Sequence, residues 1–308
     1  MNLTEAELAR AKNKARLRRG MFILPSLFTA MNIGAGYFAI IQTIQAAANN
    51  QLSNNSLVFL THLDLAAIAI LIAIPFDSLD GRIARMTNTA SDFGRELDSL
   101  ADVITFGVAP SLLAFVWGFH FLPDTISPEL RHHLLQAGGF ICFLFLIAGA
   151  SRLARFNISH DPKPRNPGRP DRKYFVGMPI PAAAGLLAAT VHLCNGIPVQ
   201  AWWVAILWLV LVGLAGFLMV STWRFWSGKE IDLSRAHPVR LLFVIPVVLY
   251  VMIRFSQVVL FAFALTYMFS GIWARAAYGW SRRRRRGRRD DHQPHDETTH
   301  DPDPLRHS

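Results

Sequence analysis

Four aspartates stand where one apolar stretch ends and the next begins. Asp77, Asp80, Asp98 and Asp102 are separated by three, eighteen and four residues within FDSLDGRIARMTNTASDFGRELDSLAD. Spacings of three and four place side chains on one face of a helix. If the two faces meet, four carboxylates converge, and their repulsion favours either protonation or a bound cation. Ligand sets made only of oxygen suit Mg²⁺ or Mn²⁺.

Small and basic residues accompany these aspartates. Gly81, Ala84 and Gly94 are small, so two helices and a phosphate can approach one another closely there. Arg85 shares the face of the first aspartates and can contact a phosphate. Two divalent ions can clamp a pyrophosphate, and a carboxylate left partly free can take a proton from an attacking hydroxyl. The pattern D-x2-D-G-x2-A-R-x8-G-x3-D-x3-D thus predicts metal-assisted phosphate chemistry rather than ordinary surface charge.

Long apolar runs must position these residues. The chain has 308 residues, of which 52% are hydrophobic and 17% charged, whereas soluble domains carry about 25% charged residues. Runs of about 20 apolar residues match the hydrocarbon core of a bilayer. The sequence therefore predicts an all-α, polytopic membrane helical bundle with about eight transmembrane helices. The expected spans are 22–44, 57–76, 100–121, 134–155, 176–196, 201–221, 240–253 and 255–275.

The basic residues predict an orientation for this bundle. The net charge is +10, and with eight spans every strongly basic loop and both termini fall on one side. By the positive-inside rule that side is the cytoplasm, so we expect a cytoplasmic (inner) membrane protein whose aspartates face the cytoplasm. Insertion signals and attraction to anionic lipid explain the basic clusters without nucleic acid. Three parts are expected: a basic N-terminal segment 1–20, a membrane catalytic domain 21–276, and a cytoplasmic tail 277–308 that is basic at first and then rich in His and Asp and disordered from Asp290.

The aspartate pattern resembles the signature of the CDP-alcohol phosphatidyltransferases, and every position of that signature is met. The resemblance implies a membrane enzyme with a six-helix core, which works as a homodimer and uses two divalent ions, Mg²⁺ or Mn²⁺. It implies that Asp102 is the general base. The metal ligands it implies are Asp77, Asp80, Asp98 and Asp102. The residues it implies for the CDP-diacylglycerol site are Gly81, Ala84, Arg85 and Gly94.

Within this family the chain is most similar to the phosphatidylserine synthases, over about residues 19–275. The similar stretches include LDSLADVITFGVAPS, SRLARFN and KYFVGMPIPAAAG. This similarity implies transfer of a phosphatidyl group from CDP-diacylglycerol to L-serine within the lipid membrane, giving phosphatidylserine and CMP. One departure is Ser26, where the family commonly has asparagine, so the role of that position is in doubt.

Further residues are candidates for substrate contacts. Arg152, Arg155 and Asn157 stand at the inner end of the fourth span, where a guanidinium can grip the serine carboxylate or a lipid phosphate. They can equally serve as positive-inside anchors. Thr29 and Asn32 lie within the first span, where they either touch the nucleotide or form hydrogen bonds between helices.

Two other functions compete with serine transfer. The same chemistry with another alcohol, such as glycerol 3-phosphate or an inositol phosphate, would use the same metal site. An ion or metabolite transporter could use the aspartates as a relay. Transporters place such charges near the bilayer midplane and on repeated or broken helices, whereas these aspartates lie at the end of a span.

Overall fold

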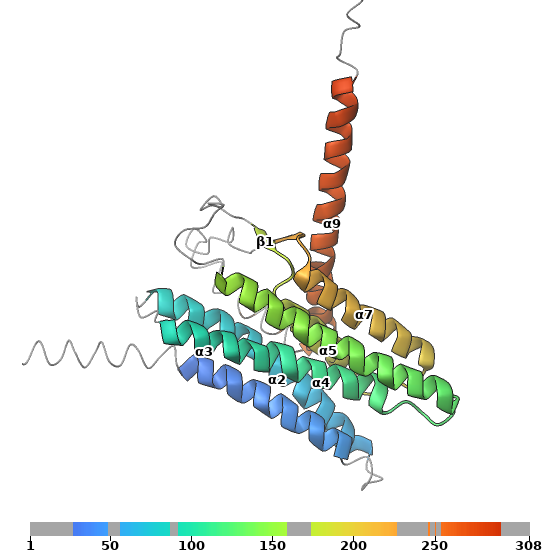
Figure 1. Ribbon diagram of the computed structural model, residues 1–308. Helices are drawn as coiled ribbons and strands as arrows, with labels where there is room; N and C mark the ends of the chain where they lie inside the picture. Colours follow the sequence, from blue (N-terminus) through green and yellow to red (C-terminus); the bar gives the residue numbers. More distant parts are fainter. Residues whose placement is uncertain are drawn as a thin grey trace, which may run out of the picture.

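The computed structural model describes residues 27–48, 56–86, 92–158, 174–226 and 254–290, together with Pro246 and Tyr250. Within these ranges the protein is a bundle of helices that run side by side (Figure 1). The first helix is Leu27–Ala48. The remaining helices are α2 (Ser56–Met86), α3 (Asp92–Asp102), α4 (Ala109–Phe115), α5 (Pro128–Ile158), α6 (Ile180–Leu193), α7 (Trp202–Val220) and α9 (Ser256–Asp290).

Six helices of the described part are long and apolar enough to cross a membrane. The protein is therefore a polytopic helical membrane protein, as the composition predicts. Most predicted spans coincide with these helices, and α9 begins at Ser256, close to the expected division of the last apolar block.

Two of these helices differ in length from the predicted spans, and one predicted span lies outside the described residues. The span expected at 176–196 is shorter in the structure, where α6 has 14 residues. Its chain enters through an extended segment that ends at Pro179, a residue that cannot donate a helical hydrogen bond. The span expected at 240–253 lies outside the described residues, apart from Pro246 and Tyr250. At the other end, α9 continues to Asp290, past the end of the span expected at 255–275.

The third span is a single helix with two changes of pitch. From α3 the chain passes into a π-helical segment η1 (Val103–Val108), then α4, then a second π-helical segment η2 (Val116–His120). Such segments interrupt the α-helical hydrogen bonding and often occur at functional sites. In η1, the Thr105 hydroxyl donates a 2.9 Å hydrogen bond to the carbonyl of Asn32 in the first helix. This contact ties the first helix to the turn directly after Asp102.

A glycine allows this close approach of the two helices. A Cβ atom on Gly36 would lie 2.5 Å from the Thr105 hydroxyl oxygen and 2.8 Å from its Cα. Because one of these atoms belongs to the backbone of η1, a larger residue at position 36 would force the two helices apart. By contrast, a Cβ on Gly34, in the same helix, would meet nothing within 4 Å.

This pair of glycines gives a matched test of the packing. We expect Gly36→Ala to destabilise the protein by about 1–3 kcal/mol, the usual cost of overpacking. Gly34→Ala should be neutral or slightly stabilising, because alanine is favoured over glycine in a helix by about 1 kcal/mol. Thermal unfolding of both variants in detergent measures the difference. Equal effects of the two substitutions would contradict the close contact.

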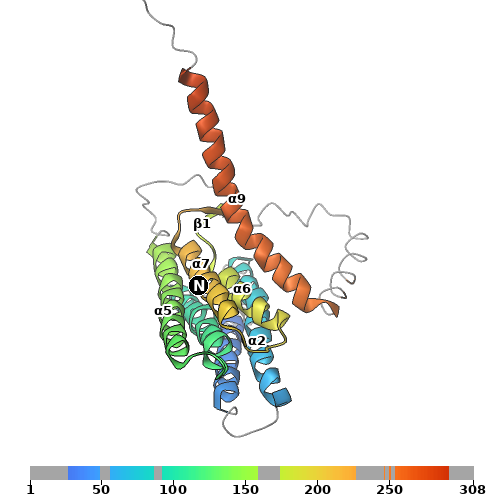
Figure 2. The same ribbon diagram turned by 90° about the vertical axis from the view of Figure 1, so that its right-hand side faces the viewer.

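A short antiparallel strand pair lies beside the bundle and meets α9. Strand β1 (Tyr174–Val176) pairs with β2 (Arg224–Trp226), with Phe175 opposite Phe225. Phe225 is fully buried, and α9 passes next to this pair as it crosses the bundle obliquely (Figure 2). Through β2, which follows α7, this strand pair packs against the C-terminal helix α9.

A polar network joins three helices away from the aspartates. His192 of α6 forms hydrogen bonds through Nδ1 with Asp64 of α2, at 2.6 Å, and through Nε2 with Ser256 of α9, at 3.0 Å. Asp64 precedes Asp77 by 13 residues in the same helix, a distance of about 20 Å along its axis. The network therefore fastens the start of α9 at the end of the bundle opposite the acidic cluster.

Candidate active site

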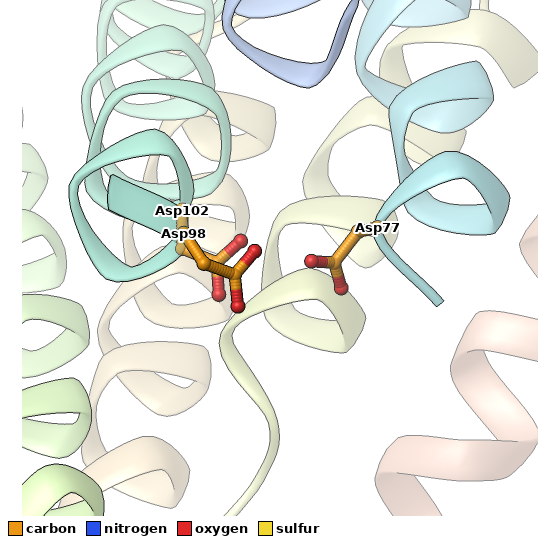
Figure 3. A group of neighbouring side chains, drawn as sticks. All are labelled: Asp77, Asp98 and Asp102. Carbon is orange, nitrogen blue, oxygen red and sulfur yellow. The ribbon is translucent and has the colours of Figure 1, made fainter. Parts of the chain in front are cut away.

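Three of the four predicted aspartates come together in the structure. One carboxylate oxygen from each of Asp77, Asp98 and Asp102 lies within 4.8 Å of the other two. Figure 3 shows Asp77 on α2 facing Asp98 and Asp102, which project from α3 on the same side. The expected convergence of two helix faces is therefore present for these three residues.

The local sequence explains how α2 and α3 present the carboxylates. Asp98 and Asp102 are four residues apart in α3 and so share a face. On α2, Pro75 has no N–H to donate to the preceding turn, which loosens the helix just before Asp77. The neighbouring Phe76 ring lies 6.4 Å from that of Phe28, so the first helix packs against this part of α2.

The three aspartates are buried or partly buried, so three negative charges close together would be unfavourable without a cation. Asp102 is only 8% exposed, and Asp77 and Asp98 are partly buried. The Oδ1 atom of Asp98 is buried without a hydrogen-bond partner among the described residues. Buried carboxylate oxygens need a donor or a cation, so this arrangement fits a divalent cation held by oxygen ligands.

The remaining motif residues are placed only by their backbone. Asp80, Gly81, Ala84 and Arg85 belong to the last turns of α2, one to two turns beyond Asp77. Their side chains lie outside the part that the structure describes, so their predicted contacts stay predictions. Gly94 lies in α3, one turn before Asp98, as the spacing requires.

One of the predicted arginines lies beside the acidic cluster. Arg152 of α5 lies near the turn that carries Asp102, because α5 packs against η1 and its end is bonded to α3, and the Nε atom of Arg152 is buried without a hydrogen-bond partner among the described residues. Arg155 is exposed, and its guanidinium lies 3.5 Å from the carbonyl of Val220. Asn157 donates a 2.9 Å hydrogen bond to Ser99 of α3. Arg152 is therefore the best placed of the three to contact a substrate.

The two polar residues of the first helix are both buried. Thr29 is 6% exposed and Asn32 is fully buried. Both side-chain polar atoms of Asn32 have no hydrogen-bond partner among the described residues. The hydrogen bond from the Thr105 hydroxyl to the Asn32 carbonyl places Asn32 about one turn from Asp102. A buried amide with unused donors and acceptors is suited to contact a polar ligand.

Sequence reasoning missed Tyr267. It lies in the apolar run of α9, and its ring stacks on Phe225 of β2, with ring centroids 5.8 Å apart. A single tyrosine within an apolar helix carries almost no signal, because such residues commonly serve in packing. Only the path of α9 across the bundle brings it against β2.

Comparison with known proteins agrees with this geometry. The family model for CDP-alcohol phosphatidyltransferase matches residues 22–207. A CDP-diacylglycerol–serine O-phosphatidyltransferase from Helicobacter pylori is 38% identical over 212 residues, covering 68% of this chain and 75% of that protein.

Two more distant relatives match a shorter part. The enzyme of the same name from Saccharomyces cerevisiae is 33% identical, covering 53% of this chain and 51% of that protein. An archaetidylserine synthase from Methanothermobacter thermautotrophicus is 32% identical, covering 52% of this chain and 54% of that protein. The chain belongs to the CDP-alcohol phosphatidyltransferase family of membrane enzymes.

Proposed function

We propose that this enzyme transfers the phosphatidyl group of CDP-diacylglycerol to L-serine, giving phosphatidylserine and CMP. The observation that carries the proposal is the convergence of Asp77, Asp98 and Asp102 within a chain of this family. The names of the relatives support serine as the acceptor, since the bacterial, yeast and archaeal proteins are all named as serine-using synthases.

The proposed reaction uses the aspartates in two ways. Asp77, Asp80, Asp98 and Asp102 would hold Mg²⁺ or Mn²⁺, with two ions expected. Such ions supply charge neutralisation of the pyrophosphate and of the leaving phosphate. Asp102 also serves as general base: it accepts the proton of the serine hydroxyl as that oxygen forms a bond to the phosphorus carrying diacylglycerol. The phosphoanhydride bond breaks, and CMP leaves with the electron pair.

Other residues are proposed to bind the lipid nucleotide. Gly81, Ala84 and Gly94 let the CDP group approach the helices, and Arg85 contacts a phosphate. In the first helix, Thr29 and Asn32 are proposed to contact the nucleotide, and the buried amide of Asn32, which has no hydrogen-bond partner among the described residues, supports this role.

The membrane setting and orientation are also part of the proposal. The diacyl tails remain in lipid, while the CDP head group reaches the aspartates at the end of the spans. We propose that the protein lies in the cytoplasmic (inner) membrane and that this end of the bundle faces the cytoplasm, because the basic loops are on the same side as the aspartates and the positive-inside rule assigns that side to the cytoplasm. A homodimer is part of the proposal, and chemical cross-linking in native membranes would test it.

The alternative is the same transfer to another alcohol. Purified protein in detergent should release CMP from CDP-diacylglycerol when L-serine is added, and far less with glycerol 3-phosphate, myo-inositol 1-phosphate or choline. Release with one of those alcohols alone would keep the metal-site argument and discard serine. Absence of release with every acceptor, from folded protein, would reject the transferase proposal.

A further inference from the structure

The π-helical segment η1 begins directly after Asp102 and separates α3 from α4. At its end the backbone N–H of Ala109 bonds to the carbonyl of Ile104, a step of five residues that takes up one more residue than an α-helical turn. One extra residue rotates the chain before the segment by about 100° relative to the chain after it. The π-helical turn therefore sets the direction in which the carboxylates of α3 project, provided that α4 is fixed.

The structure holds α4 more firmly than α3. Ala109 and Leu113 of α4 are four residues apart and fully buried in the core. By contrast, Phe93 and Leu100 of α3 are 76% and 62% exposed. Rotation of α4 would take its buried residues out of the core, whereas α3 has less packing to lose. If the π-helical turn were lost, we therefore expect α3 to move, together with its two aspartates.

One buried hydrogen bond joins the middle of η1 to the first helix. The Thr105 hydroxyl donates to the carbonyl of Asn32 at 2.9 Å, and both residues are fully buried. The two helices approach so closely here that a Cβ on Gly36 would lie 2.8 Å from the Thr105 Cα. A hydrogen bond in such surroundings is stronger than an exposed one, because the local dielectric constant is low. The bond is thus placed to hold the π-helical turn against the first helix.

We propose that Thr105 is a positioning residue: its hydrogen bond to the first helix maintains the π-helical turn, and this turn directs Asp98 and Asp102 toward Asp77. The inference rests on the proposed function, in which these carboxylates hold the divalent cations. Thr105 acts only through the placement of the carboxylates. Removal of groups that orient metal ligands typically lowers metal affinity or activity by about 10–100-fold.

The test is Thr105→Val, which replaces the hydroxyl with a methyl group and keeps the branched shape of the side chain. We expect the Kd for Mn²⁺, measured in detergent from the EPR signal of the free ion, to rise at least about tenfold. At saturating Mn²⁺, kcat for serine-dependent CMP release should fall at least about tenfold. The KM for L-serine should change less than about twofold, because no substrate contact is removed.

Two further variants at the same position isolate the hydroxyl. Thr105→Ser retains it, so the Kd for Mn²⁺ and kcat should both stay within about threefold of the wild type. Thr105→Ala removes the hydroxyl with a smaller side chain and should behave as Thr105→Val does. It gives the same comparison if the valine protein does not fold.

Thr43→Val is the matched control in the first helix. Thr43 is 1% exposed, and its hydroxyl donates a 2.8 Å hydrogen bond to the carbonyl of Ala39 in the same helix. It lies 11 residues after Asn32, about 16 Å further along the helix axis. The same chemical change at Thr43 should leave the Kd for Mn²⁺ and kcat unchanged, whatever it does to the Tm of the metal-free protein.

The outcomes distinguish this inference from the proposed function. An unchanged Kd for Mn²⁺ and kcat in folded Thr105→Val or Thr105→Ala protein overturns the inference alone. An equal loss in Thr43→Val overturns it too, because general loosening would then explain the effect. An equal loss in Thr105→Ser does the same, because the hydroxyl would then not matter. A wild-type protein that binds no Mn²⁺ and releases no CMP overturns the proposed function, and this inference with it.

Discussion

Asp102→Asn is expected to lower the rate of serine-dependent CMP release by about a thousandfold, within the usual range for loss of a general base. The substituted amide could not accept the serine proton, and as a neutral group it would be a weaker ligand for a cation. The substitution keeps the size of the side chain and removes one charge from a crowded acidic cluster. Folding should therefore survive, and the apparent Tm should not fall.

Asp124→Asn is the matched control for this experiment. Asp124, in the loop before α5, is exposed and forms a 3.0 Å ion pair with Arg131 of α5, and exposed pairs contribute about 0–1 kcal/mol. The activity of this variant should equal that of the wild type. If Asp102→Asn kept more than about a tenth of the wild-type rate, Asp102 would be neither base nor essential ligand.

Removal of divalent cations is expected to have an equally large effect. Treatment with EDTA should abolish CMP release, because neutralisation of the pyrophosphate contributes several kcal/mol to such reactions. Excess Mg²⁺ or Mn²⁺ should restore the activity. Full activity after exhaustive chelation would exclude the proposed cofactor.

Stability gives a second readout of the same site. Since a cation binds the folded protein, adding it at about 100 times its Kd should stabilise the fold by about 2.7 kcal/mol, measured as a rise in apparent Tm. In the metal-free state Asp98→Asn should be more stable than the wild type, because it relieves repulsion among the three carboxylates. With the cation present the order should reverse. A destabilised metal-free Asp98→Asn protein that does not respond to cations would contradict this account.

The aspartate site was largely predictable because its information is local. Spacings of three and four within α2 and α3 place Asp98 and Asp102 on one face, and a short connection forces α2 and α3 to be neighbours. The apolar runs likewise predict the long spans, because hydropathy and length determine insertion. Arg152 was predicted as a candidate, but only the packing of α5 distinguishes it from Arg155.

Features that depend on distant contacts were not predictable in this way. The π-helical turn after Asp102 packs against Gly36 of the first helix, and no local sequence pattern predicts this turn. The shortness of α6 depends on the extended chain at its start. Tyr267 stacks on Phe225 only because α9 crosses the bundle beside β2, a tertiary arrangement that hydropathy does not determine.

The most direct test of the central claim is to identify both products made from CDP-diacylglycerol and L-serine labelled with ¹⁸O in its hydroxyl. Attack of that hydroxyl on the diacylglycerol-bearing phosphorus predicts phosphatidylserine that retains the label and an equal amount of unlabelled CMP. Mass spectrometry of the lipid and the nucleotide measures both. CMP formed with phosphatidic acid instead of labelled phosphatidylserine, under the same conditions, would contradict the account.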